Sequence, residues 1–166
     1  MHARPTATAL PTEPTMRPWN TLIDLLTPEM ILLDVESGSR REVFRTAAQL
    51  YAQHLGAVAE HVATHLQERE RLGSTALGHA VAIPHARIGG ISAPAAAVVR
   101  CRHGLDMEAP DEQPVRLFFF LLVPQQATQV HLEMLAGIAE KLSDPQLRTA
   151  LMQAASPADF LALLRG

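Results

Sequence analysis

One stretch decides the fold of this 166-residue chain: Leu117-Phe118-Phe119-Phe120-Leu121-Leu122-Val123. Its side chains are all apolar, without the alternation of polar and apolar residues that marks a strand with one face in water. Pro124, which has no N–H to donate, follows directly and ends the run. The run is far shorter than the roughly 20 residues that a helix needs to cross a bilayer. The stretch therefore predicts a central strand that is buried on both faces.

Helical patterns lie on both sides of this strand in the sequence. Before it, Ser39 is suited to cap a helix that Gly56 ends, and a second helix is predicted over about 57–71. After it, Thr128 is suited to cap a helix that runs to Leu142. The predicted core stripe of that helix is Leu132, Leu135, Ala136, Ala139 and Leu142. The buried strand is therefore expected to lie among helices.

Further elements complete this pattern. Short helices are predicted at 22–26, from Pro145 onward and over 156–164, and further strands at 30–33, 81–83 and 95–101. Helices that alternate with strands around a buried strand indicate an α/β sandwich. We predict one such domain over residues 19–166. Residues 1–18 contain prolines and no apolar signal-peptide core, so we expect a flexible N-terminal extension there.

Composition narrows the class of protein. The chain is 48% hydrophobic, which argues against disorder, and its net charge of −3 gives no support for nucleic-acid binding. Cys101 is the single cysteine, so no internal disulfide is possible, as is usual in a reducing cytoplasm. We therefore expect a cytoplasmic protein that neither binds nucleic acid nor inserts into a membrane.

The candidate chemistry lies at Ile83-Pro84-His85. A proline fixes its own φ and holds the preceding residue extended, so we expect the strand at 81–83 to end in a turn that presents His85. A neutral imidazole is a good nucleophile, and a guanidinium is well suited to hold a phosphate. Arg69 stands sixteen residues earlier, on the predicted apolar face of the second helix with Val58, Val62 and Leu66. The pair suggests a histidine that accepts a phosphoryl group.

These residues resemble the type-2 enzyme IIA domains of the bacterial phosphotransferase system (PTS), the mannitol/fructose and nitrogen-regulatory group. Three matches occur in order: Arg69 in the stretch Glu68-Arg69-Glu70-Arg71-Leu72-Gly73-Ser74-Thr75, His85 in Ile83-Pro84-His85, and His131, 46 residues further on. The resemblance runs from about residue 21 to 164 and implies a mixed β-sheet flanked by helices. Ala86 departs from the family, which usually has glycine there. If that position needs a positive φ, alanine would be strained by roughly 1 kcal/mol.

The resemblance also implies roles for the residues. His85 would accept the phosphoryl group from an HPr-like phosphocarrier protein, and Arg69 would clamp that group. His131 would give it a hydrogen bond, and Ser74 and Thr75 are candidates for backbone or hydroxyl contacts. The phosphoryl group would pass to an enzyme IIB cysteine, or the phosphorylation state would act as a signal to a target protein. Neither a metal nor a cofactor is implied.

Three alternatives remain open on the sequence. The stretch 128–144 looks closest to the nitrogen-regulatory members, and the chain carries no IIB or IIC sequence, so we favour regulation over a fructose- or mannitol-type transport subunit. A pure interaction module, in which His85 is never phosphorylated, is a rival of another class. A zinc hydrolase is disfavoured, since His61 and His65 stand four apart but Val62 replaces the glutamate of the H-E-x-x-H pattern.

Overall fold

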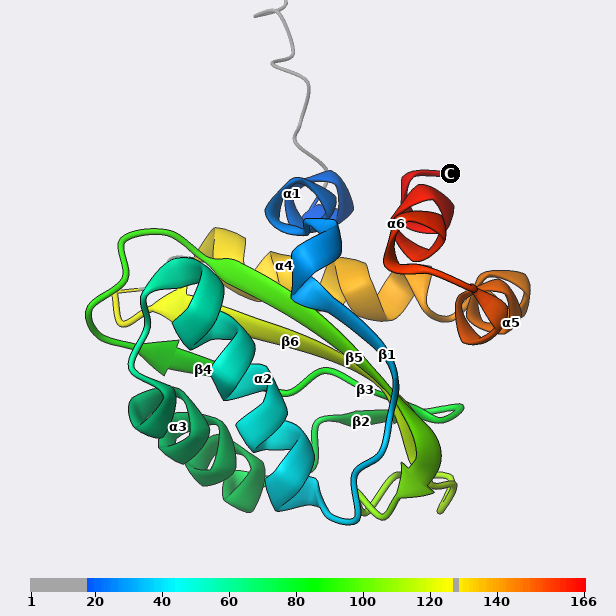
Figure 1. Cartoon of the computed structure of the whole chain (residues 1–166), viewed down its shortest axis with the longest axis horizontal. Coiled ribbons are helices and arrows are strands. Elements are labelled where there is room, and N and C mark those ends of the chain that lie inside the picture. Colours follow the sequence, from blue (N-terminus) through cyan, green and yellow to red (C-terminus); the bar gives the residue numbers. More distant parts are fainter. Residues whose placement is uncertain (1–17, 127–128) are drawn as a thin grey trace, which may run out of the picture.

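The structure, a computed structural model, describes residues 18–126 and 129–166. The predicted extension, apart from Pro18, and the predicted helix cap Thr128 lie outside these residues. Within them a six-stranded mixed sheet has the order β1-β5-β6-β3-β2, with β4 also paired to β6 (Figure 1). The strands are β1 (Ile31–Val35), β2 (Ala76–Gly78), β3 (Val81–Ala82), β4 (His85–Ile88), β5 (Ala95–Leu105) and β6 (Val115–Pro124).

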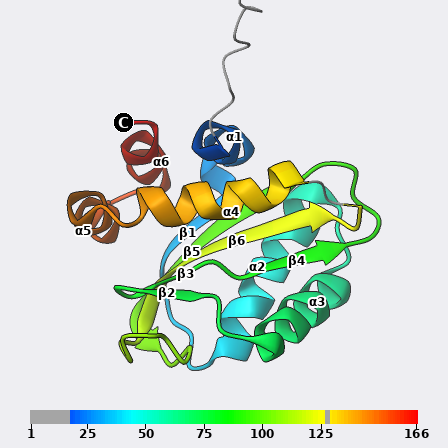
Figure 2. The ribbon, with the colours of Figure 1, turned by 180° about the vertical axis from the view of Figure 1, so that it is seen from behind.

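Helices cover both faces of the sheet. They are α1 (Pro18–Leu25), the short 3₁₀ helix η1 (Pro28–Met30), α2 (Arg40–Leu55), α3 (Ala59–Leu72), α4 (Gln129–Lys141), α5 (Pro145–Gln153) and α6 (Pro157–Arg165). In Figures 1 and 2, α2 and α3 lie on one face, and α1, α4, α5 and α6 lie on the other. The predicted α/β sandwich with a mixed sheet is confirmed.

Strand β6 is the centre of this arrangement. Its side chains alternate between two separate hydrophobic clusters, one under each helical layer. Phe120 meets Phe44 of α2 edge to face, with ring centroids 5.7 Å apart, whereas Phe119 packs near Phe160 of α6 at 6.1 Å. The prediction of a strand buried on both faces is confirmed.

The predicted ends of α2 are also confirmed. The Ser39 hydroxyl accepts a hydrogen bond from the Glu42 N–H, which satisfies one of the free donors at the start of the helix. Gly56 follows the last turn with a φ of 69°, a left-handed conformation that glycine adopts without a steric penalty.

The predicted turn after Pro84 is wrong. His85 instead begins β4, and β3 and β4 follow the same side of β6 in one constant parallel register, from Val81 opposite Leu117 to Ile88 opposite Pro124. Pro84 lacks only an N–H, and its carbonyl still accepts a hydrogen bond from the Leu121 N–H at 3.0 Å. The chain therefore passes straight through the proline. Strand β2, which hydrogen-bonds to β3, was not predicted.

Two predicted core stripes need correction. Val58 precedes α3 and is 57% exposed, and Leu132 of α4 is 47% exposed. Among the side chains of α4 whose burial the structure describes, Met134 and Ile138 are buried, and Leu142 is buried just after the end of the helix. The reason is that α4 is apolar on two faces, and only one of them packs on the sheet. The other face is free to line a cavity.

No helix in the described part of the chain is long and apolar enough to cross a membrane.

Tyr51 joins α2 to the sheet and provides a test of this packing. Its side chain is fully buried, and its hydroxyl lies 3.1 Å from the Ala95 carbonyl oxygen and 3.2 Å from that of Phe120. Burial raises the pKa of the Tyr51 hydroxyl well above its usual range, so this group stays a donor at ordinary pH. Tyr51→Phe keeps the ring and removes only the hydrogen bond, so we expect a loss of about 1 kcal/mol in the free energy of unfolding, measured by urea denaturation. Tyr51→Ala, which also leaves a cavity, should cost roughly 3–5 kcal/mol. A Tyr51→Phe variant as stable as the parent would contradict the assigned role of the hydroxyl.

Candidate functional site

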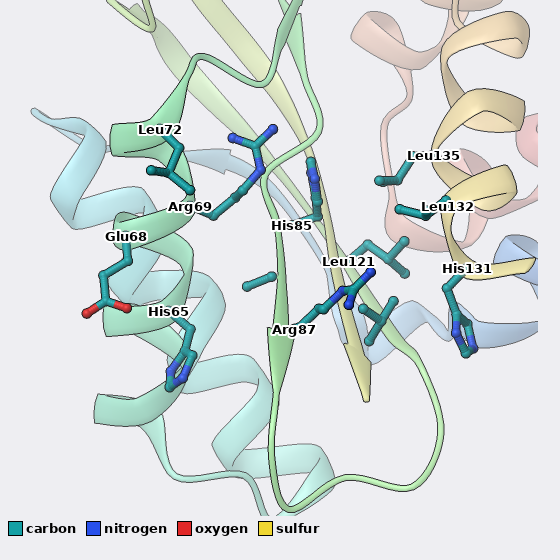
Figure 3. Close-up of a pocket in the computed structure, with 12 residues that line it drawn as sticks. His65, Glu68, Arg69, Leu72, His85, Arg87, Leu121, His131, Leu132 and Leu135 are labelled. Carbon is teal, nitrogen blue, oxygen red and sulfur yellow. The ribbon is translucent and has the colours of Figure 1, made fainter. Parts of the chain in front are cut away.

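A cavity of about 590 Å³ brings the three principal predicted residues together. It opens where β4, the C-terminal part of α3 and the first turns of α4 meet, and Arg69, His85 and His131 all line it (Figure 3). Much of its wall is apolar and comes from Ala86, Leu121, Val123, Leu132 and Leu135. The exposed face of α4, which the sequence analysis assigned to the core, is thus one wall of the site.

His85 is held in a defined orientation by its own strand. Its Nδ1 lies 2.9 Å from the Ile83 carbonyl oxygen, and because a carbonyl only accepts, Nδ1 carries the proton and donates. The lone pair of the neutral ring is therefore on Nε2. Partial burial lowers the pKa of His85, the bond to Ile83 partly opposes this, and the nearby Arg69 charge lowers it further. The neutral form, which is the nucleophilic form of an imidazole, is favoured near pH 7.

Arg69 lies in the last turn of α3 and extends from that helix into the cavity, toward His85 (Figure 3). Its guanidinium donates to the Gly73 carbonyl oxygen at 2.9 Å, directly beyond the helix end. The loop that contains Gly73 is fixed in turn by Glu70, whose side chain is 5% exposed. The Glu70 carboxylate accepts hydrogen bonds from the Thr75 N–H at 3.0 Å and the Thr75 hydroxyl at 2.7 Å. A buried carboxylate thus supports the loop to which the Arg69 guanidinium is bound.

His131 lies in the first turn of α4 and is half-buried. It lines the same cavity as His85, but Figure 3 shows its ring turned away from the His85 ring. A hydrogen bond from His131 to a group on His85 would need a change of side-chain rotamer, a motion that is fast for side chains near the surface.

Ser74 and Thr75 lie beside the site but in a second cavity, which they share with His85 and Leu135. The Ser74 hydroxyl donates to the Met107 carbonyl oxygen, and the Thr75 hydroxyl donates to Glu70. Each hydroxyl proton is thus bound within the protein. A contact between either residue and a phosphoryl group stays a prediction.

Arg87 was missed by the sequence analysis. It lies two residues after His85 in β4, is exposed, and lines the same cavity. Side chains two apart in a strand point to the same side of the sheet. This signal was in the sequence, but the turn that was wrongly predicted after Pro84 concealed it.

The departure from the family at Ala86 brings no strain. The described non-glycine residues with a positive φ are Asp34, His79, Ala80, Glu108 and Glu112. Ala86 is an ordinary strand residue, buried between β4 and the helical layer of α2 and α3.

The two histidines on α3, His61 and His65, lie one turn apart. The His65 Nδ1 donates to the His61 carbonyl oxygen at 2.7 Å, within the helix. In residues 18–126 and 129–166, no three His, Cys, Asp or Glu side chains are grouped so that they could hold a metal ion.

Comparisons with known proteins identify the family of this chain. Residues 24–166 match the family described as "Phosphoenolpyruvate-dependent sugar phosphotransferase system, EIIA 2". The "Nitrogen regulatory protein" of Pseudomonas aeruginosa is 40% identical over 134 residues, which are 80% of this chain and 87% of that protein.

Solved structures give the same result. The crystal structure of the nitrogen regulatory protein IIA-Ntr from Neisseria meningitidis is 39% identical, with a TM-score of 0.82, and the match covers 87% of this chain and 99% of that one. The IIA mannitol structure from Escherichia coli shares the fold, with a TM-score of 0.71 at 20% identity over 84% of this chain and 98% of that one. The match over residues 24–166, together with these relatives, shows that this chain belongs to the type-2 EIIA family of the phosphoenolpyruvate-dependent sugar phosphotransferase system.

Proposed function

We propose that His85 accepts a phosphoryl group on Nε2 from an HPr-like phosphocarrier protein, and that the chain acts as a nitrogen-regulatory IIA signalling protein. The observation that carries this proposal is the hydrogen bond from His85 Nδ1 to the Ile83 carbonyl, in a cavity that Arg69 also lines. It fixes the proton on Nδ1 and leaves the Nε2 lone pair for attack.

The transfer balances without a further reactant. As the Nε2–P bond forms on His85, the P–N bond of the donor phosphohistidine breaks. The donor ring, with its other nitrogen protonated, leaves as a neutral imidazole, and the positive charge passes to the His85 ring. That ring keeps the proton on Nδ1 and donates it in a hydrogen bond to the Ile83 carbonyl oxygen. This bond therefore stabilises the phosphorylated, cationic imidazole.

The other residues act on the charge of the transferred group. Phosphoryl transfer asks a protein mainly to position the reactants and to stabilise charge on the equatorial oxygens. Arg69 supplies a cation from α3, and His131 supplies a donor from α4 after its rotamer change. Since the clamp is cationic, the proposal requires neither a metal nor a cofactor.

The regulatory branch is favoured by the relatives. The Pseudomonas aeruginosa protein and the Neisseria meningitidis structure are both named as nitrogen regulatory proteins. Their sequence identity to this chain is about twice that of the IIA mannitol protein. A sugar-transport subunit that passes phosphate to an enzyme IIB cysteine is the second candidate, supported by the shared fold. We place either activity in the cytoplasm.

The central test is transfer from a labelled donor. Incubation with phosphoenolpyruvate, enzyme I and an HPr-like protein should add one acid-labile phosphate, and His85→Ala should abolish it. The substitution removes a half-buried side chain at a strand end, so circular dichroism should show a folded variant. Undiminished labelling of folded His85→Ala would overturn the assignment, and a parent protein that takes no label would favour the interaction module. Rapid passage of the label to fructose- or mannitol-type enzyme IIB would favour the transport branch.

Arg69 is expected to act in two separable ways. Arg69→Gln removes the charge that helps to lower the pKa of His85, so that pKa should rise, as measured by NMR titration of the ring. Only the neutral ring attacks. As the pH is lowered, Arg69→Gln should therefore lose phosphate acceptance at a higher pH than the parent does. Arg69→Lys keeps the charge but loses the planar fork, so it should largely preserve the pKa of His85 while slowing transfer.

Arg71→Gln is the matched control, since Arg71 lies two residues away on the same helix and does not line the cavity of His85. It should leave both the titration and the transfer rate unchanged. Parent-like transfer by Arg69→Lys would show that the fork does not hold the phosphate.

His131 should be dispensable as an acceptor. His131→Ala should still be phosphorylated at His85, because the nucleophile and its hydrogen bond to Ile83 are intact. The loss of one donor to a charged oxygen costs roughly 1.5–3 kcal/mol, or about ten- to a hundred-fold in rate when it is fully expressed in the transition state. His131→Gln, which keeps an N–H donor, should recover part of the rate. Phosphate mapped to residue 131 by mass spectrometry, with His85 unmodified, would reverse the two roles.

A further inference from the structure

We propose that Arg87 is a second binding residue for the phosphoryl group, which pairs with that group only after it has been placed on His85. This inference rests on the proposed phosphorylation of His85 and names a residue of the site that the resemblance to the family does not assign.

The first argument is position. In the parallel register of β4 on β6, His85 lies opposite Leu121 and Arg87 opposite Val123. Ala86 and Ile88, the alternate residues, belong to the cluster under α2 and α3, so His85 and Arg87 share the opposite side of the strand. Their Cα atoms are about 6–7 Å apart, a span that an extended arginine side chain covers.

The second argument is availability. Arg87 is exposed, and in the part of the chain that the structure describes its guanidinium makes no hydrogen bond and no ion pair. The Arg69 guanidinium, by contrast, already donates to Gly73. In Figure 3, Arg69 approaches His85 from α3, whereas Arg87 extends from β4 in the direction of α4. The two guanidinium groups therefore reach the cavity from different elements.

The third argument is charge. A phosphoryl group carries close to two negative charges near pH 7, and apolar side chains form much of this cavity. A charge that is taken into such surroundings without a partner is costly. Arg69 balances one of the two charges, and Arg87 is the second cation that lines the cavity. Glu68 also lines it, but Figure 3 shows its carboxylate pointing away from His85.

The timing follows from the unphosphorylated state. There, Figure 3 shows the Arg87 side chain directed toward α4 and not toward the His85 ring. In the described part of the chain Arg87 makes no hydrogen bond to that ring, whereas the Arg69 charge and burial lower the pKa of His85. The phosphoryl group itself supplies the attraction that draws Arg87 toward His85. Arg69 and Arg87 are therefore expected to differ in when they act.

The experiment uses phosphoramidate, which phosphorylates histidine with release of ammonia and needs no partner protein. The parent, Arg87→Gln, Arg87→Lys and the control Arg71→Gln are labelled, and the signal of His85 is identified by its loss in His85→Ala. The pH titration of the phosphoryl group is followed by ³¹P NMR. The unphosphorylated ring of His85 is titrated by NMR in parallel. Arg87 is exposed, so its substitution should change the stability by no more than about 0.5 kcal/mol.

The expected pattern separates the two arginines. Arg87→Gln should move the phosphoryl titration to higher pH by about half a pH unit, Arg87→Lys should fall between it and the parent, and Arg71→Gln should match the parent. The unphosphorylated ring should titrate as in the parent when Arg87 is replaced, but not when Arg69 is replaced.

Each of three other outcomes would overturn the inference. Coincident phosphoryl titrations of Arg87→Gln and the parent would refute it while the phosphorylation of His85 stands. A changed titration of the unphosphorylated ring in Arg87→Gln would show that Arg87 acts before phosphate arrives, contrary to the proposal. A parent protein without phosphate on His85 would refute both the proposed function and this inference.

Discussion

Strand β6 imposes the constraint on which the rest of the structure depends. Its apolar side chains point alternately to the two faces of the sheet, so exposing either face to water would cost free energy. One face is covered by α2 and α3, and the other by α1, α4, α5 and α6. Since both helical layers must be present, the edge of the sheet at β4 is enclosed from two sides. The site lies at this edge because it is the place where the two layers approach each other.

The site is built with few interactions because the sheet has already fixed its geometry. His85 is placed by its register on β6, and a single bond to the carbonyl of Ile83 sets its tautomer. Arg69 is placed by the end of α3 and the loop beyond it, which the buried Glu70 supports. Burial and the neighbouring cation both lower the pKa of His85 and favour the neutral imidazole, the form that the proposed transfer requires.

Much of this architecture was predictable from local signals. The apolar run at 117–123 gave the central strand, and Ser39 and Gly56 gave the ends of α2. The prediction failed where a local sequence signal was compatible with two structures. Pro84 was read as a stop, yet a proline lacks only a donor, and the chain continued in register because its carbonyl still pairs with β6. Leu132 was read as core because hydrophobicity alone does not tell a packed face from the wall of a cavity. Arg87 escaped notice as a consequence of the first error. The roles proposed for Arg69, His85 and His131 rest on their spacing and the family resemblance, whereas the tautomer of His85 follows only from the coordinates.

The two separate hydrophobic clusters have a consequence for incompletely folded molecules. A molecule in which only α2 and α3 have docked has covered one face of β6, and it lacks the wall that α4 provides beside His85. In a molecule in which only the other layer has docked, α3 does not lie against the sheet, so Arg69 is not held beside His85. The complete cavity thus exists only in chains that have completed both halves of the fold. Under the proposed function, the fraction of chains that take up a phosphoryl group therefore cannot exceed the fraction in which both helical layers have docked.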